Sequence, residues 1–277
     1  MLLLLPSLWL LSCTEPPPAV RAEKKLELIG SIQRLLLAAM EAEKSAVLST
    51  TDEESIAFAE ESKKDNAEVE RARVELRRLV EVDDRETEVT AVTKFEGAWR
   101  EVQAVDERLL KLAVANTNLK ASRLAAGEAA TAVNQLVDAL AEIEAVTTAP
   151  AVLRELSGAS VAALRIQALL PSHIASPTDA EMTQLEERMR AQRQVIEQAL
   201  ANARKSPAAA QTRAAEAWEA WARYQHLTEE IIRLSRLNTN VLSTDLSVHE
   251  KREVMVAAQN ALSALRAEVQ DVPRATR

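Results

Sequence analysis

One segment occurs twice in this chain, and both copies keep the same register. The first copy, Trp99–Asn118, reads WREVQAVDERLLKLAVANTN, and the second, Trp221–Asn240, reads WARYQHLTEEIIRLSRLNTN. The tryptophans that begin the copies stand 122 residues apart, and so do the asparagines that end them. A gapless repeat over this length predicts that one structural unit is used twice along the chain.

The composition and the spacing of apolar residues both indicate helices. Only 4 of the 277 residues are Gly and 3% are aromatic, whereas Ala, Leu, Glu and Arg are abundant. These residues lose little side-chain freedom in a helix. In both copies, apolar residues recur every three or four positions and form a seam that ends in an asparagine on the same side, Asn116 or Asn238. Each copy is therefore expected to be an amphipathic helix.

Three more helices are expected in each round of the repeat. The first round predicts helices over about 23–48 and from Thr51, which can cap its helix with Glu54 three residues later, to about residue 82. A fourth helix to about residue 146 follows the repeated segment, with Gly127 marking a close approach or a bend near its start. In the second round, Pro171 is expected to end the first helix. Ser176-Pro177 and Ser206-Pro207 are expected to begin the next two.

Four amphipathic helices with short turns bury their apolar stripes best as an antiparallel bundle. The expected fold class is all-α, with two tandem antiparallel four-helix bundles over residues 23–147 and 151–272. The boundary is placed at Thr147-Thr148-Ala149-Pro150, because proline interrupts a helix interior. The alternative is one elongated bundle in which a helix runs on through Pro150.

The N-terminus has the features of an export signal. Residues 1–12 form an apolar run too short to span a bilayer but typical of a secretory signal peptide. Leu10-Leu11-Ser12-Cys13 resembles a bacterial lipobox, which predicts lipidation of Cys13 and anchoring to a membrane. No basic residue precedes the run, so the alternative is the end of a transmembrane anchor in which Cys13 is incidental. The proline-rich residues 13–22 are expected to form a stiff spacer.

The signal-peptide-like run and the lipobox together predict a lipid-anchored protein of the bacterial cell envelope that faces the periplasm. Thr14 is not an acidic retention signal, which favours the outer membrane.

Several functional classes are disfavoured by the sequence. The net charge of −8 argues against nucleic acid as a partner. The three histidines, His173, His226 and His249, share no metal-ligand spacing and are expected to be ordinary surface or boundary residues. Neither a phosphate-binding glycine loop nor a hydrolase motif is present. The sequence thus predicts a protein that is not an enzyme and holds no metal or cofactor.

A set of residues in fixed order resembles a known family. The set contains Glu43-Lys44 with Leu48, Thr51-Asp52-Glu53, Phe95, Trp99, the stretch from Leu109 to Asn118, Ala121 and Gly127. In this order, over about residues 26–143, it resembles the four-helix-bundle sensor domain of methyl-accepting chemotaxis proteins. The second round is a more divergent copy, with Leu170-Pro171 where Glu43-Lys44 would align.

The resemblance implies an extracytoplasmic domain that detects small molecules, either directly or through a binding protein, and that often forms a homodimer. Chemoreceptors continue into a second transmembrane helix and a cytoplasmic transmitter, which this sequence lacks. The chain is therefore expected to be a sensor module without its own transmitter, with an envelope protein or a chemoreceptor as a partner.

The candidate ligand-binding residues are polar or aromatic side chains on the expected helices: Arg34, Lys44, Trp99, Asn116, Trp221 and Asn238. Each has an alternative structural role. The asparagines can set helix register or satisfy carbonyls at a helix end, the tryptophans can fill the core, and the charged residues can lie on solvated faces. Two functions remain open: a sensory module that binds a ligand or a partner, and a structural spacer or adaptor of the envelope without a small-molecule ligand.

Overall fold

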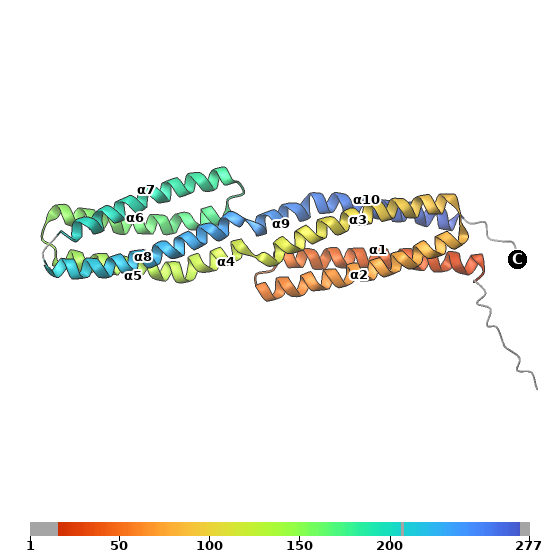
Figure 1. Cartoon of the computed structure of the whole chain (residues 1–277), viewed down its shortest axis with the longest axis horizontal. Helices are drawn as coiled ribbons and strands as arrows, with labels where there is room; N and C mark the ends of the chain where they lie inside the picture. Colours follow the sequence, from red (N-terminus) through yellow and green to blue (C-terminus); the bar gives the residue numbers. More distant parts are fainter. Residues whose placement is uncertain (1–15, 206–207, 272–277) are drawn as a thin grey trace, which may run out of the picture. The chain divides into compact units, whose positions relative to one another are not determined.

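The computed structural model describes residues 16–205 and 208–271, and all regular structure in these ranges is helical, which confirms the all-α prediction (Figure 1). The expected signal peptide, Cys13 and Ser206-Pro207 lie outside the described residues. The elements are α1 (Pro18–Leu48), α2 (Asp52–Asp83), α3 (Glu86–Ala115), α4 (Thr117–Leu124), a π-helix η1 (Ala125–Ala129), α5 (Ala130–Val146), α6 (Pro150–Ala175), α7 (Asp179–Ala203), α8 (Ala208–Leu237), α9 (Thr239–Val248) and α10 (Glu250–Gln270).

Threonine side chains cap the second helix of both rounds. Thr51 Oγ1 accepts a hydrogen bond from the Glu54 backbone N–H at 3.1 Å, as the sequence predicts for α2. Thr178 Oγ1 accepts one from the Glu181 N–H at 3.3 Å at the start of α7. The N-cap of α7 is therefore Thr178, and the prediction that Ser176-Pro177 begins this helix is wrong.

Pro171 does not end the first helix of the second round. Helix α6 continues to Ala175, with Pro171 in its interior. Leu170 and Ile174 on either side of the proline are buried, so packing holds these turns in place. The proline lies near the helix end, where the single backbone hydrogen bond it removes costs least.

The described residues divide into two units. The first contains the chain up to Glu43, Glu60–Asp106 and the chain from Glu250 onward. Its core joins apolar residues of four helices: Ile29, Ile32 and Leu36 of α1, Val69, Leu76 and Val80 of α2, Val92, Phe95 and Trp99 of α3, and Met255, Leu262 and Leu265 of α10. Helix α10 thus completes a four-helix bundle with the first three helices of the chain.

The second unit contains Lys44–Ala59 and Glu107–His249. Helices α5, α6, α7 and α8 pack around a core that is rich in alanine (Figure 1). Among its larger side chains are Leu136, Ile166, Ile196, Trp221 and Tyr224.

This arrangement corrects the predicted division into residues 23–147 and 151–272. The fourth helix of the first round, α5, packs in the second unit, and the fourth helix of the second round, α10, packs in the first. The reason lies in the connections, because only Asn116 separates α3 from α4 and only Asn238 separates α8 from α9. Reversing the direction of a helix takes a loop of about two to five residues, so the chain continues past each asparagine instead of folding back on its own round.

The predicted boundary near Pro150 is a turn within the second unit. Thr147 and Ala149 have extended backbone conformations, and Pro150 begins α6. A helix continuous through Pro150, the alternative prediction, is therefore excluded.

The helices that follow the repeated segments are interrupted at equivalent positions. Gly127 lies inside η1, and His249, 122 residues later, separates α9 from α10. A Cβ atom at Gly127 would meet nothing within 4 Å, so the predicted close approach is wrong and the irregularity is the π-helical turn itself.

None of the described helices combines the length and the apolarity needed to cross a membrane.

Candidate functional site

Each repeated segment has, two residues before its end, an asparagine with a left-handed backbone. The φ and ψ angles are 50° and 37° at Asn116, and 49° and 33° at Asn238. Asparagine visits this region more readily than other residues with a side chain, because its short amide can hydrogen-bond locally. The two asparagines therefore bend the chain in the same way at equivalent points.

The residues after these asparagines hydrogen-bond to each other across the repeat. The Thr117 N–H donates to Thr239 Oγ1 at 3.0 Å, and the Thr239 N–H donates to Thr117 Oγ1 at 3.3 Å. The two hydroxyl oxygens lie 3.1 Å apart. These bonds satisfy backbone donors at the starts of α4 and α9 that have no partner within their own helix.

Asn118 and Asn240 repeat this reciprocity one residue later. The Asn118 N–H donates to Asn240 Oδ1 at 3.1 Å, and the Asn240 N–H donates to Asn118 Oδ1 at 3.2 Å. The side-chain amide of Asn118 also donates to Asn238 Oδ1 at 2.8 Å, and that of Asn240 to Asn116 Oδ1 at 2.9 Å. We call residues 116–118 and 238–240 together the Asn-Thr-Asn joint.

The joint is less symmetric in its contacts with neighbouring helices. Asn118 Nδ2 donates to the Ile174 carbonyl at 2.8 Å, and Asn238 Nδ2 donates to the Ser176 carbonyl at 3.3 Å, so the end of α6 is attached to the joint. Asn116 Nδ2 is buried and has no hydrogen-bond partner among the described residues. The second-round half of the joint is therefore the more completely bonded one.

A buried histidine lies next to the joint. His173 is fully buried; its Nδ1 lies 2.9 Å from Ser235 Oγ, and its Nε2 lies 2.9 Å from Glu186 Oε1. The Ser235 hydroxyl is also 3.0 Å from the His173 carbonyl. Arg236 Nε donates to the same Glu186 oxygen at 2.7 Å. We call His173, Glu186, Ser235 and Arg236 the His173 cluster.

The hydrogen bonds of Ser235 in the His173 cluster are linked, because its hydroxyl has one proton to donate. That proton can go either to the His173 carbonyl or to His173 Nδ1.

Glu186 is held in its charged form. Partial burial on its own would raise the pKa of the Glu186 carboxyl, but hydrogen bonds from Arg236 and His173 outweigh it and leave the pKa below its usual value. The carboxylate is therefore ionised over the physiological pH range.

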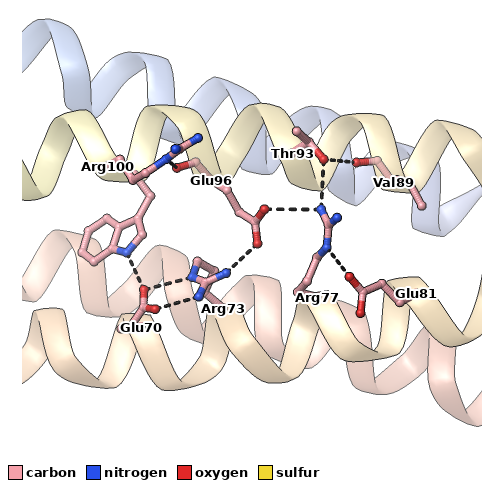
Figure 2. A network of polar contacts seen from close by, with 9 residues as sticks. Glu70, Arg73, Arg77, Glu81, Val89, Thr93, Glu96 and Arg100 are labelled. Atoms are coloured by element: carbon pink, nitrogen blue, oxygen red, sulfur yellow. Dashed lines mark hydrogen bonds and ion pairs between the residues drawn. The ribbon is translucent and has the colours of Figure 1, made fainter.

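A second polar network lies in the first unit between α2 and α3 (Figure 2). The Trp99 indole N–H donates to Glu70 Oε2 at 2.9 Å, and Arg73 contacts Glu70 through two nitrogens, at 2.9 and 2.7 Å. Arg73 also pairs with Glu96 at 2.5 Å, and Glu96 accepts from Arg77 at 3.3 Å. The hydrogen bond from Arg73, ahead of that from Trp99, holds the pKa of Glu70 below its usual value. This network ties two helices together and leaves little free hydrogen-bonding capacity.

The structure brings two of the predicted site residues together. Asn116 and Asn238 both belong to the joint. Trp99 lies in the first unit and Trp221 in the second, and both are buried in their cores. The Trp221 indole N–H has no partner among the described residues. Arg34 and Lys44 are exposed on α1.

Three features of this region were not anticipated. His173 is buried rather than at the surface, and its partner Glu186 is contributed by α7, which no spacing in the sequence connects to α6. Asn118 and Asn240 also take part in the joint, through both their backbone N–H groups and their side chains. The exact recurrence of Asn-Thr-Asn after 122 residues was the available signal, because identical polar residues at equivalent positions can pair about a twofold axis.

Among the described residues, no three His, Cys, Asp or Glu side chains gather in a way that could hold a metal ion.

Comparison with known proteins gives a similarity in fold. The sensor domain of the histidine kinase TorS from V. parahaemolyticus is similar, with a TM-score of 0.52 at 12% sequence identity, over 92% of this chain and 100% of that domain. At this identity the likeness shows the fold alone, a helical bundle architecture like that of a sensor domain. No protein-family model matches the chain, and no curated protein matches its sequence.

Proposed function

We propose that this chain is a sensory module that binds a ligand or a partner protein in the cell envelope and catalyses no reaction. The observation that carries the proposal is the likeness to a sensor domain over 92% of the chain. At 92% coverage, the likeness includes residues of both units. The proposed kinship with chemoreceptor sensor domains rests on the residue set around Glu43-Lys44, Trp99 and Asn116-Thr117-Asn118.

The Asn-Thr-Asn joint supports this proposal. Its reciprocal hydrogen bonds are short-range and directional, so a small rotation of α4 or α9 breaks several of them together. Packed elements with discrete arrangements of this kind are what a sensor needs to convert binding into a change of conformation. A ligand shifts such an equilibrium only by its difference in affinity for the two states.

A thermal shift assay of the folded chain against a panel of metabolites tests the sensory proposal. A ligand that binds the native state raises the melting temperature by mass action, so a reproducible rise for one chemical class is expected. If no metabolite changes the melting temperature and an envelope protein co-purifies with the chain, the spacer or adaptor function would replace the sensory proposal.

We further propose that lipid on Cys13 anchors the module, with the folded part in the periplasm and the outer membrane as the favoured location. The support is the position of Cys13, the sole cysteine of the chain, at the end of the apolar run. Metabolic labelling with palmitate should mark the wild-type chain and not Cys13→Ser. An unlabelled wild-type chain overturns the anchor.

A further inference from the structure

A small groove lies between α7 and α8 of the second unit, beside the His173 cluster. It encloses about 220 Å³ and is lined by Glu186, Met189, Arg190, Arg193, Glu229 and Ile232. Sites for drug-sized ligands occupy roughly 300–1,000 Å³, so this groove suits a molecule of only a few heavy atoms.

The charged side chains of the groove differ in how many hydrogen bonds and ion pairs they already make. Glu229 accepts from Arg193 at 3.1 Å and from Gln225 at 3.0 Å. Glu186 accepts from Arg236 and His173. Arg190, in contrast, has no hydrogen bond or ion pair with any described residue of the chain. The Arg190 guanidinium group is therefore free to bind a carboxylate through paired N–H donors.

The floor of the groove is apolar. Met189 is 1% exposed, and Ile232 packs against the core of the second unit. An unbranched hydrocarbon chain of a few carbons can lie on this floor, where it covers the exposed part of Ile232 and removes its own apolar surface from water. An inorganic anion such as phosphate would leave this surface uncovered.

We propose that the groove binds a short-chain monocarboxylate, with its carboxylate on Arg190 and its hydrocarbon chain on Met189 and Ile232. This inference rests on the proposed sensory function and names the ligand class for it.

The groove is connected to the joint by direct contacts. Glu186 lines the groove and is hydrogen-bonded to His173, which is in turn hydrogen-bonded to Ser235. At the end of α6, which carries His173, the Ile174 and Ser176 carbonyls accept hydrogen bonds from the side-chain amides of Asn118 and Asn238 of the joint. A ligand that changes the position of Glu186 therefore acts on the same hydrogen-bonded set as the joint.

Isothermal titration of the folded chain with butanoate tests this proposal. Butanamide, which has nearly the same shape and no charge, is the matched probe. Saturable binding is expected for butanoate and not for butanamide. Arg190→Gln should weaken butanoate binding by about tenfold or more, the equivalent of about 1.4 kcal/mol. Arg188→Gln alters an exposed arginine that does not line the groove and should leave the affinity unchanged.

Three results would overturn the monocarboxylate site. They are a butanoate titration without saturation, equal binding of butanamide, and unchanged butanoate affinity in Arg190→Gln. Arg190 is exposed, so its substitution should leave the melting temperature unchanged, which a parallel melt checks. A metabolite that binds wild type and Arg190→Gln equally well would remove the groove as its site and leave the sensory proposal standing.

Discussion

Asn116 and Asn238 begin the Asn-Thr-Asn joint, which holds the two copies of the repeat together within the second unit. Each has a left-handed backbone, and each is followed by a threonine and an asparagine that bond their counterparts in the other copy. Because the bonds are reciprocal, a change in one copy leaves a buried group without a partner in the other. Substitutions here are therefore expected to be coupled.

Replacing Thr117 by valine removes the acceptor of the buried Thr239 N–H, and Thr239→Val does the same to Thr117. Each single substitution should lower the free energy of unfolding by about 1–3 kcal/mol. The double variant should cost less than the sum, by about the 0.5–1.5 kcal/mol of the shared hydroxyl–hydroxyl bond. Urea denaturation measures all three, with exposed Thr244→Val as the control. Strict additivity would show that the hydroxyls do not interact.

The pH dependence of stability should report on Glu186. Its pKa is lower in the folded chain than in the unfolded chain, so its contribution to stability is complete above the unfolded value of about 4.3. That contribution is lost as the pH falls through the folded pKa. Thermal melts between pH 5 and pH 3 measure this loss, and Glu186→Gln should lose less stability over this range than wild type. Glu187→Gln, at an exposed position, is the control and should show the same pH dependence of stability as wild type. If wild type and Glu186→Gln also show the same pH dependence, Glu186 does not contribute in this way.

At the scale of the elements, the two rounds share irregularities as well as helices. The chain deviates from α-helix at η1 in the first round and at His249 in the second, 122 residues apart. In η1 the Ala125 carbonyl accepts a hydrogen bond from Gln167 Nε2 at 2.7 Å. A π-turn frees backbone groups for such contacts.

Gly127→Ala tests whether the π-turn requires glycine. The residue is exposed, its φ is not positive, and an added Cβ would meet no atom within 4 Å. Alanine should therefore stabilise the chain by about 0.4–1 kcal/mol, because it restricts the unfolded state. Gly97→Ala, in the regular helix α3 with equal space, is the matched control in thermal melts. Destabilisation by Gly127→Ala alone would mean that the π-turn depends on glycine.

Helix α10 is attached to α3 by a buried ion pair. Lys251 pairs with Asp106, and both side chains are almost completely buried. Asn66 Nδ2 donates to the second Asp106 oxygen at 2.9 Å. The pair thus links three helices of the first unit near the start of α10.

Lys251→Met should destabilise the chain strongly, by about 3–5 kcal/mol, because it leaves the Asp106 charge buried without its partner. The double variant Lys251→Met/Asp106→Leu should recover much of the loss, since an apolar pair of similar volume removes the uncompensated charge. Guanidinium denaturation compares the two variants. If the double variant is as unstable as the single one, the cost arises from packing and not from charge.

At the scale of the whole molecule, the exchange of α5 and α10 makes neither round of the repeat a complete bundle. The first round lacks the apolar stripe that Met255, Ala258, Leu262 and Leu265 contribute to its core. Helices α4 to α9, in contrast, contain all the residues of the second core.

Two fragments should therefore behave differently. Residues 117–248 should give a cooperative thermal transition by circular dichroism, because they retain the second core. Residues 23–147 should give no such transition, because the stripe that α10 covers is exposed and the burial of apolar surface is the main driving force for folding. Cooperative melting of 23–147 would show that this round can close on its own α5.

The helices themselves follow from local sequence. Apolar spacing and the Thr51 cap are properties of contiguous residues, so the existence of α1, α2 and α3 could be predicted. The prediction that Pro171 ends its helix is wrong, because the burial of Leu170 and Ile174 stabilises α6 by more than the loss of one backbone hydrogen bond costs. The His173 cluster could not be predicted, because Glu186 reaches it from another helix.

What the sequence by itself determined is that this chain repeats one helical pattern with a period of 122 residues, ending each copy in Asn-Thr-Asn. Only the tertiary structure decided which helices share a core. Either round could supply a fourth amphipathic helix to either bundle, since their apolar stripes are equivalent. The one-residue connections at Asn116 and Asn238 do not reverse the chain, and the reciprocal hydrogen bonds between the copies hold both connections together. Those bonds join residues far apart in sequence, and the fold alone brings them together.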